Sequence, residues 1–291
     1  MRLFKIILEE KDDEIIFEVY YINNLKMSSK KIFIVGLLLF ITIYAWSQMS
    51  VDSNRVLRIL SFNILHGATT KGDFNLDVIA KVISEAKPDF VALQEVDYKT
   101  NRAKKYDLVQ ELGFRTNMTS LFGRAMYYDD GEYGEGILTK YTLLKSRVEA
   151  LPYTADNEPR AALEIVTAIN KKDTIAFIGT HLDHTKNEND RIDQALEINE
   201  IFLLNKYPTI LAGDLNAEPG SKPINILEEI WTASYRVDSL INTYPSDYPV
   251  SKIDYIMFYP ENRWRVLETK VIQDTLASDH CAFLVVLELL D

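Results

Sequence analysis

Short hydrophobic runs alternate with amphipathic stretches and polar turns along the chain from residue 55 onward. Runs that are bounded by turn-forming residues and rich in β-branched or aromatic side chains are typical of buried strands. They predict strands at 56–62, 89–96, 137–139, 161–169, 174–179, 209–212, 252–258, 266–273 and 281–289.

Other stretches have the spacing of helices or the composition of loops. Residues 76–87 carry a hydrophobic stripe that Pro88 ends, residues 107–112 predict a short helix closed by the next glycine, and 189–204 predict a long amphipathic helix. The segment 127–136 is rich in glycine, tyrosine and acidic residues, and it predicts a surface loop.

The order of these elements indicates the fold class. Strands follow one another in pairs as often as they alternate with helices, which favours an α/β (α+β) fold of two stacked, mainly antiparallel sheets with helices outside. No repeat, low-complexity tract or linker interrupts residues 55–291, so we expect them to form one domain.

The N-terminal part has the features of an export signal. A basic start at Lys30 and Lys31 leads into the hydrophobic run 32–45, and Ala45-Trp46-Ser47 resembles a cleavage site. The run is shorter than the ~20 residues of a membrane-spanning helix. We therefore expect 27–48 to be a signal peptide, translation to start at Met27, and 1–26 to be a non-native extension. An uncleaved membrane anchor at 32–45 is the alternative, and either way the domain is exported to the periplasm or the exterior.

Composition restricts the chemistry. The single cysteine, Cys281, excludes a disulfide within the chain and a thiol-ligated metal site. The net charge of -11 provides no general electrostatic attraction for nucleic acid, although local basic loops or a bound metal could offset it. Nothing in the sequence calls for an obligate protein partner, and a monomer is expected.

Polar residues recur where the predicted buried strands end. Asp214 and Asn216 follow the strand 209–212, and as residues i and i+2 they point to the same side of extended backbone. The other strand ends carry Asn63, Glu95, His181, Asp254, and Asp279 with His280. Carboxylates crowded on one rim repel one another unless a cation neutralises them. This oxygen-rich, thiol-free set suits Mg²⁺, Mn²⁺ or Ca²⁺ better than zinc, and it suits phosphoryl chemistry.

These residues lie in motifs that resemble a known family. The motifs are Ser61-Phe-Asn63, Leu93-Gln-Glu95-Val, Gly179-Thr-His181-Leu, Gly213-Asp214-Leu-Asn216, Ile253-Asp254-Tyr and Ser278-Asp279-His280. In this order they are similar to those of the endonuclease/exonuclease/phosphatase superfamily, which has the DNase I-like fold, a four-layer sandwich. Their flanking residues look closest to a bacterial branch described as metal-dependent hydrolases.

The resemblance implies a role for each matching residue. It implies that Glu95 is the main metal ligand, with Asn63 and Asp279 nearby, and that the metal is Mg²⁺, with Mn²⁺ or Ca²⁺ as alternatives. Asp214 would orient or deprotonate water, and Asn216 would position the water or the phosphate. The resemblance also implies that Asp254 is the hydrogen-bond partner of His280 and that His280 contacts the scissile phosphate. His181 would stabilise the phosphorus centre or donate a proton to the leaving oxygen. Whether Asp214 or His280 is the formal base stays open.

Four residues lie outside these motifs but near them in sequence. His66 and His184 are either supporting or substrate-loop residues or surface histidines. Arg160 either clamps phosphate in a bidentate manner or forms a salt bridge at a hairpin edge. Arg102 has the same two interpretations, and we expect it at the surface.

The sequence therefore predicts a secreted, metal-dependent phosphoester hydrolase of phosphodiesterase or nuclease-like type. A catalytically inactive phosphoester-binding module of the same fold is the alternative, although every motif position holds a chemically competent group. The substrate stays open between nucleic acid, a lipid-derived phosphoester and a small molecule. Scattered tryptophans and few basic pairs favour none of these.

Processing of the signal can be tested directly. If 27–48 is a cleaved signal peptide, protein isolated from the native host should begin near Gln48 in intact-mass and N-terminal peptide measurements. Retention of residues 27–47 in the mature protein would contradict cleavage and favour the anchor.

Overall fold

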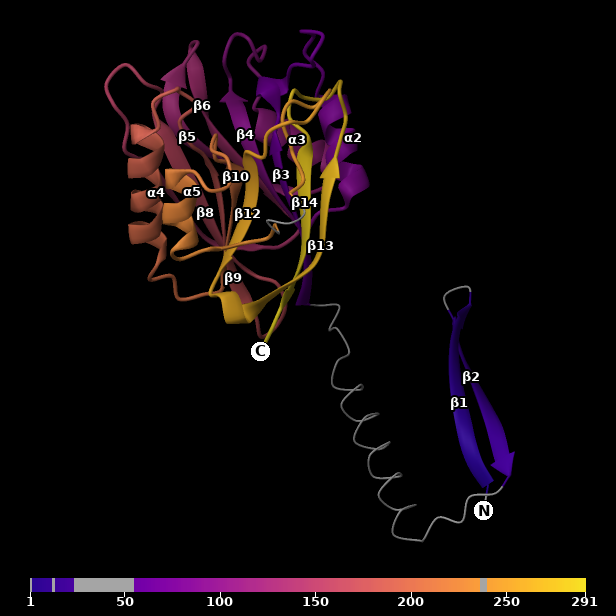
Figure 1. Cartoon of the computed structure of the whole chain (residues 1–291). Coiled ribbons are helices and arrows are strands. Elements are labelled where there is room, and N and C mark those ends of the chain that lie inside the picture. Colours follow the sequence, from indigo (N-terminus) through magenta and orange to yellow (C-terminus); the bar gives the residue numbers. More distant parts are fainter. Residues whose placement is uncertain (1, 12–13, 24–54, 236–239) are drawn as a thin grey trace. The chain divides into compact units, whose positions relative to one another are not determined.

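The computed structural model describes residues 2–11, 14–23, 55–235 and 240–291 (Figure 1). The chain divides into two compact units, 1–51 and 52–291. The first contains an antiparallel pair, β1 (Arg2–Lys11) and β2 (Glu14–Asn23). The predicted signal peptide at 27–48 lies outside the described residues. None of the helices in the described ranges is both long and apolar enough to span a membrane.

Two six-stranded sheets form the second unit. One contains β7 (Leu143–Leu151), β8 (Arg160–Ala168), β9 (Thr174–His181), β10 (Thr209–Asp214), β11 (Thr232–Ala233) and β12 (Asp254–Tyr259), in the order β11-β12-β10-β9-β8-β7. The other contains β3 (Val56–Asn63), β4 (Phe90–Tyr98), β5 (Thr119–Tyr128), β6 (Gly131–Thr139), β13 (Trp264–Ile272) and β14 (Ala282–Leu289), in the order β13-β14-β3-β4-β6-β5. Only the pairs β3–β4 and β9–β10 are parallel.

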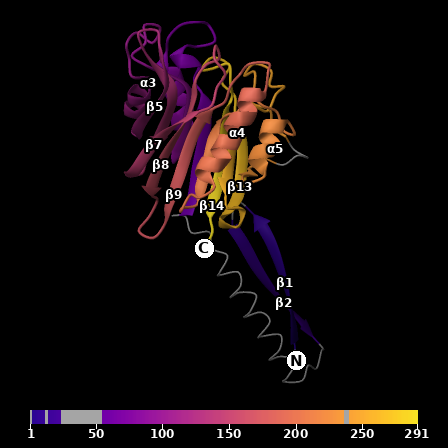
Figure 2. The same ribbon diagram turned by 90° about the vertical axis from the view of Figure 1, so that its left-hand side faces the viewer.

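Helices cover the outer face of each sheet and give four layers (Figures 1 and 2). These helices are α2 (Leu76–Ala86), α3 (Leu108–Thr116), α4 (Asn189–Phe202) and α5 (Lys222–Glu228), with short 3-10 turns at Leu65–Gly67 and Glu261–Arg263. Helices α2 and α3 pack on the sheet that contains β3, and α4 and α5 pack on the sheet that contains β10. The predicted fold, two mainly antiparallel sheets with helices outside, is confirmed.

Strands that are hydrophobic on both faces explain how the layers are held together. In β10, Ile210 and Ala212 join the core between the sheets, whereas Leu211 joins the core beneath α4 and α5. In β4, Phe90 faces the core between the sheets, and Val91 faces the core beneath α2 and α3. Because alternate residues of a strand point to opposite faces, one continuous hydrophobic run supplies two cores.

The β5–β6 hairpin corrects the expectation of a loop at 127–136. Strands β5 and β6 pair from Thr119–Thr139 to Tyr128–Gly131, so the turn is confined to Asp129 and Asp130. Glycine and acidic residues are poor strand formers, but pairing with neighbouring strands overrides that preference. At Gly134 a Cβ would lie 2.0 Å from the carbonyl oxygen of Gly123, so this glycine allows a close approach of strands. Strands β5 and β7 and helix α5 were not predicted.

Other boundaries also differ from the sequence prediction. Helix α3 continues past Gly113 to Thr116 and ends at Asn117, which adopts a left-handed conformation with φ of 54°. Strand β4 does not end at Glu95. The strand continues to Tyr98 across a bulge between Leu93 and Val96, and Glu95 there has φ of 56°. A bulge turns a side chain away from the regular alternation, and here it re-aims the Glu95 carboxylate.

The close contact of β9 and β10 gives the first prediction from the structure. A Cβ on Gly213 would lie 2.1 Å from the carbonyl oxygen of Thr180, so Gly213→Ala must part the two strands. We expect it to lower the free energy of unfolding by about 1–3 kcal/mol, as overpacking does. Gly179→Ala is the matched control, because its Cβ would meet Ile137 at an ordinary 3.4 Å. Equal denaturation midpoints for the two variants would contradict this account.

Candidate active site

The polar residues predicted at strand ends meet on one rim of the two sheets. In the strand register, Asp214 at the end of β10 lies beside His181 at the end of β9. Its other partner is Asp254, the first residue of β12. Because β9 and β10 are parallel and β12 is antiparallel to them, two strand ends and one strand start coincide there. Asn63 ends β3, and His280 lies two residues before the start of β14.

His280 lies between two carboxylates. Its Nδ1 is 3.1 Å from Asp254 Oδ2, and its Nε2 is 3.5 Å from Asp214 Oδ2. Burial alone would lower the pKa of His280, but the charges of Asp254 and Asp214 raise it to about 10. The imidazole is therefore protonated at neutral pH, and Asp254 orients it.

The carboxylate of Asp214 is almost completely buried. It accepts hydrogen bonds from the backbone N–H of Asn216 at 3.0 Å and from Asn63 Nδ2 at 3.2 Å. Burial raises the pKa of Asp214 to about 7 although His280 lowers it, because the charge of Asp254 adds to the effect of burial. A carboxylate that titrates near neutrality can accept a proton and still carry charge for part of the time.

Glu95 faces the same site from the bulge in β4. Asn63 Nδ2 donates to Glu95 Oε1 at 3.1 Å, and His66 Nδ1 lies 3.3 Å from Glu95 Oε2. Burial opposes ionisation, but the hydrogen bonds from His66 and Asn63 lower the pKa of Glu95 to about 2. Glu95 is thus a permanent anion, and Asn63 bridges it to Asp214.

His181 has a different environment from His280. Its Nδ1 lies 3.2 Å from Arg160 Nη1, and its Nε2 lies 3.0 Å from Asn216 Nδ2 and 3.5 Å from Asp214 Oδ2. Burial, followed by the charge of Arg160, holds the pKa of His181 well below its usual value. Since Arg160 can only donate, Nδ1 must accept, and the neutral ring carries its proton on Nε2, toward Asp214 and Asn216. Asn216 Nδ2 donates to the carbonyl oxygen of Leu182 at 3.1 Å, so the carboxylate of Asp214, 3.5 Å away, is the acceptor for the Nε2 proton.

Two separate groups of side chains at the rim are candidates for holding a divalent cation. Asp214, Asp254 and His280 offer ligand atoms within 4.8 Å of one another, so this buried cluster could hold an ion. However, a protonated imidazole cannot ligate a metal, and His280 is already held by Asp254. Glu95 and the pocket-lining Asp279 suit a cation better, because they offer carboxylate oxygens and Glu95 is ionised, whereas Asn63 meets Glu95 with its amide nitrogen and directs its oxygen to the backbone N–H of Leu65.

A pocket of about 450 Å³ opens over this rim. Its walls include the three residues predicted with two possible roles: His66 beside Glu95, and His184 and Arg160 on the opposite side. Arg160 is buried and contacts His184 Nδ1 at 3.1 Å and Glu158 Oε2 at 3.0 Å, so the salt bridge exists but lies inside the pocket. Arg102 also lines the pocket, and it is exposed, which agrees with its expected place at the surface.

Two further residues near the site were not predicted: Tyr244, which lines the pocket, and Glu135. Tyr244 places its ring 4.7 Å from that of His280, and burial together with nearby Asp279 raises its pKa. Glu135 is buried, and neither of its carboxylate oxygens has a hydrogen-bond partner within the described residues. Burial raises the pKa of Glu135 to about 8. Neither residue lies at a strand end, which was the only positional signal that the sequence offered.

Comparisons with known proteins agree with this geometry. The sequence profile described as "Endonuclease/Exonuclease/phosphatase family" matches residues 60–280. The structure is similar to that of an endonuclease/exonuclease/phosphatase family protein from Bacteroides thetaiotaomicron, with a TM-score of 0.67, 18% identity, and coverage of 81% of this chain and 98% of that one.

Two similar structures carry more specific names. A mannosyl-6-phosphatase from Bacteroides thetaiotaomicron has a TM-score of 0.64 and 18% identity, over 79% of this chain and 99% of that one. The human Nocturnin catalytic domain has a TM-score of 0.63 and 17% identity, over 82% of this chain and 97% of that one. At these identities the similarity establishes the fold alone.

The burial of Asp214 predicts a pH-dependent effect on stability. Its folded-state pKa is raised above the unfolded value, so the folded protein loses stability as pH rises from about 4 to about 7 and the group ionises. Asp214→Asn removes that charge, and without metal we expect it to be more stable than wild type by ~1–3 kcal/mol above pH 7 but not near pH 4. Excess Mg²⁺ should reduce the difference. Thermal melts from pH 4 to 8 test this, with exposed Asp193→Asn as control; a pH-independent difference would refute it.

Proposed function

The chain belongs to the endonuclease/exonuclease/phosphatase family, and from this premise we propose that it is an exported, metal-dependent hydrolase that attacks a phosphoester with water. Members of the family are phosphoester hydrolases. The observation that carries the proposal is the buried Asp214 carboxylate, with a pKa near neutrality, held by Asn63 and Asn216 beside a protonated His280. Such a group is suited to take a proton from water at neutral pH.

Glu95 and Asp279 would hold the divalent cation, with Mg²⁺ as the expected ion. When bound, such a cation neutralises phosphate oxygens and polarises the phosphorus centre. Glu95 suits this role because it is ionised throughout the physiological range. Asn63 keeps Glu95 and Asp214 at a defined separation through its two hydrogen bonds.

The remaining site residues have separate roles in proton transfer and in the stabilisation of charge. We assign the base to Asp214, because His280 already carries a proton at neutral pH and cannot accept another. His280 then contributes positive charge toward a bound phosphate, with Asp254 fixing its orientation. His181 is neutral and donates through Nε2, which suits stabilisation of the developing charge on phosphate oxygens better than full proton transfer.

The competing function is that of an inactive module that binds phosphoesters. Such a module would have lost a group that the chemistry requires. This site retains the ionised Glu95, the Asp214 carboxylate with its pKa near neutrality, and two imidazoles in contact with Asp214. The enzyme is therefore favoured. We propose that the protein acts as a monomer.

Metal dependence through Glu95 is the decisive test. Glu95→Gln keeps the size of the side chain but removes the charge, so turnover of bis-p-nitrophenyl phosphate and p-nitrophenyl phosphate with Mg²⁺ should fall roughly 100-fold or more. The Mg²⁺ concentration for half-maximal activity should rise in parallel. Glu85→Gln, an exposed change on α2, is the control.

Two results would overturn the proposal. Full activity of wild type in excess chelator would exclude metal dependence. Binding of phosphoesters without any turnover, in a wild type that Asp214→Asn does not alter, would instead identify the inactive binding module.

A further inference from the structure

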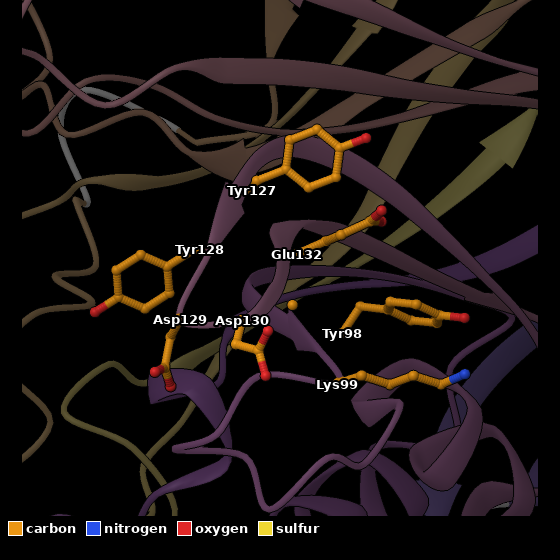
Figure 3. Close-up of a pocket in the computed structure, with 8 residues that line it drawn as sticks. Tyr98, Lys99, Tyr127, Tyr128, Asp129, Asp130 and Glu132 are labelled. Atoms are coloured by element: carbon orange, nitrogen blue, oxygen red, sulfur yellow. The ribbon is translucent and has the colours of Figure 1, made fainter.

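The pocket continues beyond the catalytic residues, along the end of the β5–β6 hairpin. A second, more open hollow of about 590 Å³ is lined there by Tyr98, Lys99 and residues 127–132. Figure 3 shows the rings of Tyr127 and Tyr128 pointing away from the hairpin in different directions, with the two aspartates at its turn. Tyr128 lines both cavities, so its ring is the wall that they share.

The charged groups around this shared wall are paired one to one. The four ion pairs are Asp97–Arg102 at 2.7 Å, Asp130–Lys105 at 2.7 Å, Glu132–Arg124 at 2.9 Å and Glu158–Arg160 at 3.0 Å. Of the charged residues that line the hollow, only Lys99 and Asp129 remain, one of each sign. This region therefore has no excess of positive charge with which to hold a second phosphate, unlike a surface that binds nucleic acid.

Arg102 is held in one orientation at the junction. Its Nε and Nη2 donate to Asp97 at 2.7 and 2.9 Å, and the Asp97 carboxylate is fully buried and also accepts from Thr100 Oγ1 at 2.6 Å. The guanidinium lies 4.6 Å from the centre of the Tyr128 ring. These contacts leave Nη1 without a partner among the described residues. An arginine whose charge is already balanced donates hydrogen bonds well to neutral oxygens but attracts anions weakly.

The tyrosines supply an apolar surface beside these donors and acceptors. Tyr127 is 74% exposed and Tyr128 is 40% exposed, so both rings are accessible to a ligand. An exposed ring offers a flat face to another flat or apolar face, and nearby carboxylates accept hydrogen bonds from hydroxyl groups. This surface therefore fits a molecule that is uncharged, rich in hydroxyl groups and apolar on one face. The flat rings would contact the apolar face, and the charge-balanced guanidinium and carboxylate groups would form hydrogen bonds with the hydroxyl groups.

We propose that the wall formed by Tyr128 and Arg102, together with the adjoining hollow, binds a sugar unit that carries the scissile phosphate. The proposal rests on the proposed phosphoester hydrolysis and narrows its substrate to sugar phosphates. The reacting phosphate occupies the rim with Glu95 and Asp214, and the neutral sugar extends along Tyr128. A polynucleotide is disfavoured, because its next phosphate would meet the charge-balanced region and the aspartates at the hairpin turn.

The test compares substrates that share the phosphate but differ in what carries it. Hexose 6-phosphates, p-nitrophenyl phosphate, bis-p-nitrophenyl phosphate and a single-stranded DNA oligonucleotide are assayed with Mg²⁺ on the full chain. We expect hexose phosphates to give the highest kcat/KM. Tyr128→Ala should raise KM for hexose phosphates at least 10-fold, and much more than for methyl phosphate, assayed in the same way, because a single methyl group does not reach along the wall.

Matched variants distinguish the loss of stacking on the Tyr128 ring from a general loss of structure. Tyr128→Phe keeps the ring and should restore most of the affinity for hexose phosphates. Tyr127→Ala, in the hollow, should raise KM for a disaccharide phosphate more than for a monosaccharide phosphate. Phe114→Ala removes an equally exposed aromatic ring, 73% accessible, from α3 and should change neither value. Thermal melts confirm that each variant is folded.

The possible results distinguish this inference from the proposed function. Hydrolysis of DNA or bis-p-nitrophenyl phosphate but of no hexose phosphate would overturn the sugar subsite and leave the hydrolase proposal intact. Equal KM changes for all substrates in Tyr128→Ala would also overturn it. If no substrate is turned over, the hydrolase proposal fails. Calorimetric titration with hexose 6-phosphate then decides the subsite by itself, and no difference between wild type and Tyr128→Ala would refute it.

Discussion

The arrangement of the site depends on how one buried carboxylate, that of Asp214, is kept among other negative charges. Asp214 and Asp254 are register partners at the ends of neighbouring strands, and both are buried. Like charges in this position would repel strongly unless a cation lay between them. His280 is that cation, and it contacts both carboxylates. Burial, together with the repulsion that remains, holds the pKa of Asp214 near 7, which is the property that the proposed chemistry requires.

The topology of the sheets brings these charges together. The parallel pairs β3–β4 and β9–β10 are each joined through a helix, α2 or α4, so the strand ends of each pair fall on one side. The antiparallel neighbours β12 and β14 begin where β10 and β3 end. Glu95 joins this rim from within β4 because the bulge redirects it. The hydrophobic cores above and below each sheet hold the rim rigid, since central strands such as β4 and β10 are buried on both faces.

The two ends of the pocket differ in their charge balance, and this difference separates catalysis from substrate recognition. At the rim, Glu95 and Asp279 face the pocket without a full set of cations, which suits a divalent ion. Around Tyr128, the carboxylates of Asp97, Asp130, Glu132 and Glu158 are each paired with an arginine or a lysine. This balance suits an uncharged part of a ligand. In an enzyme with this arrangement, the rim would carry out catalysis and the region around Tyr128 would set the substrate preference. Sequence changes at the hairpin could then alter specificity without disturbing catalysis.

The sequence alone determined the fold class, most of the buried strands and the residues that meet at the rim, because hydrophobic periodicity and strand-end motifs are local signals. It could not place residues whose position depends on distant segments. The bulge that turns Glu95 and the β5–β6 hairpin both depend on pairing with other strands. The protonation states of His181 and His280 were equally hidden, because burial and neighbouring charges set them, and only the tertiary structure puts Arg160 beside one ring and two carboxylates beside the other.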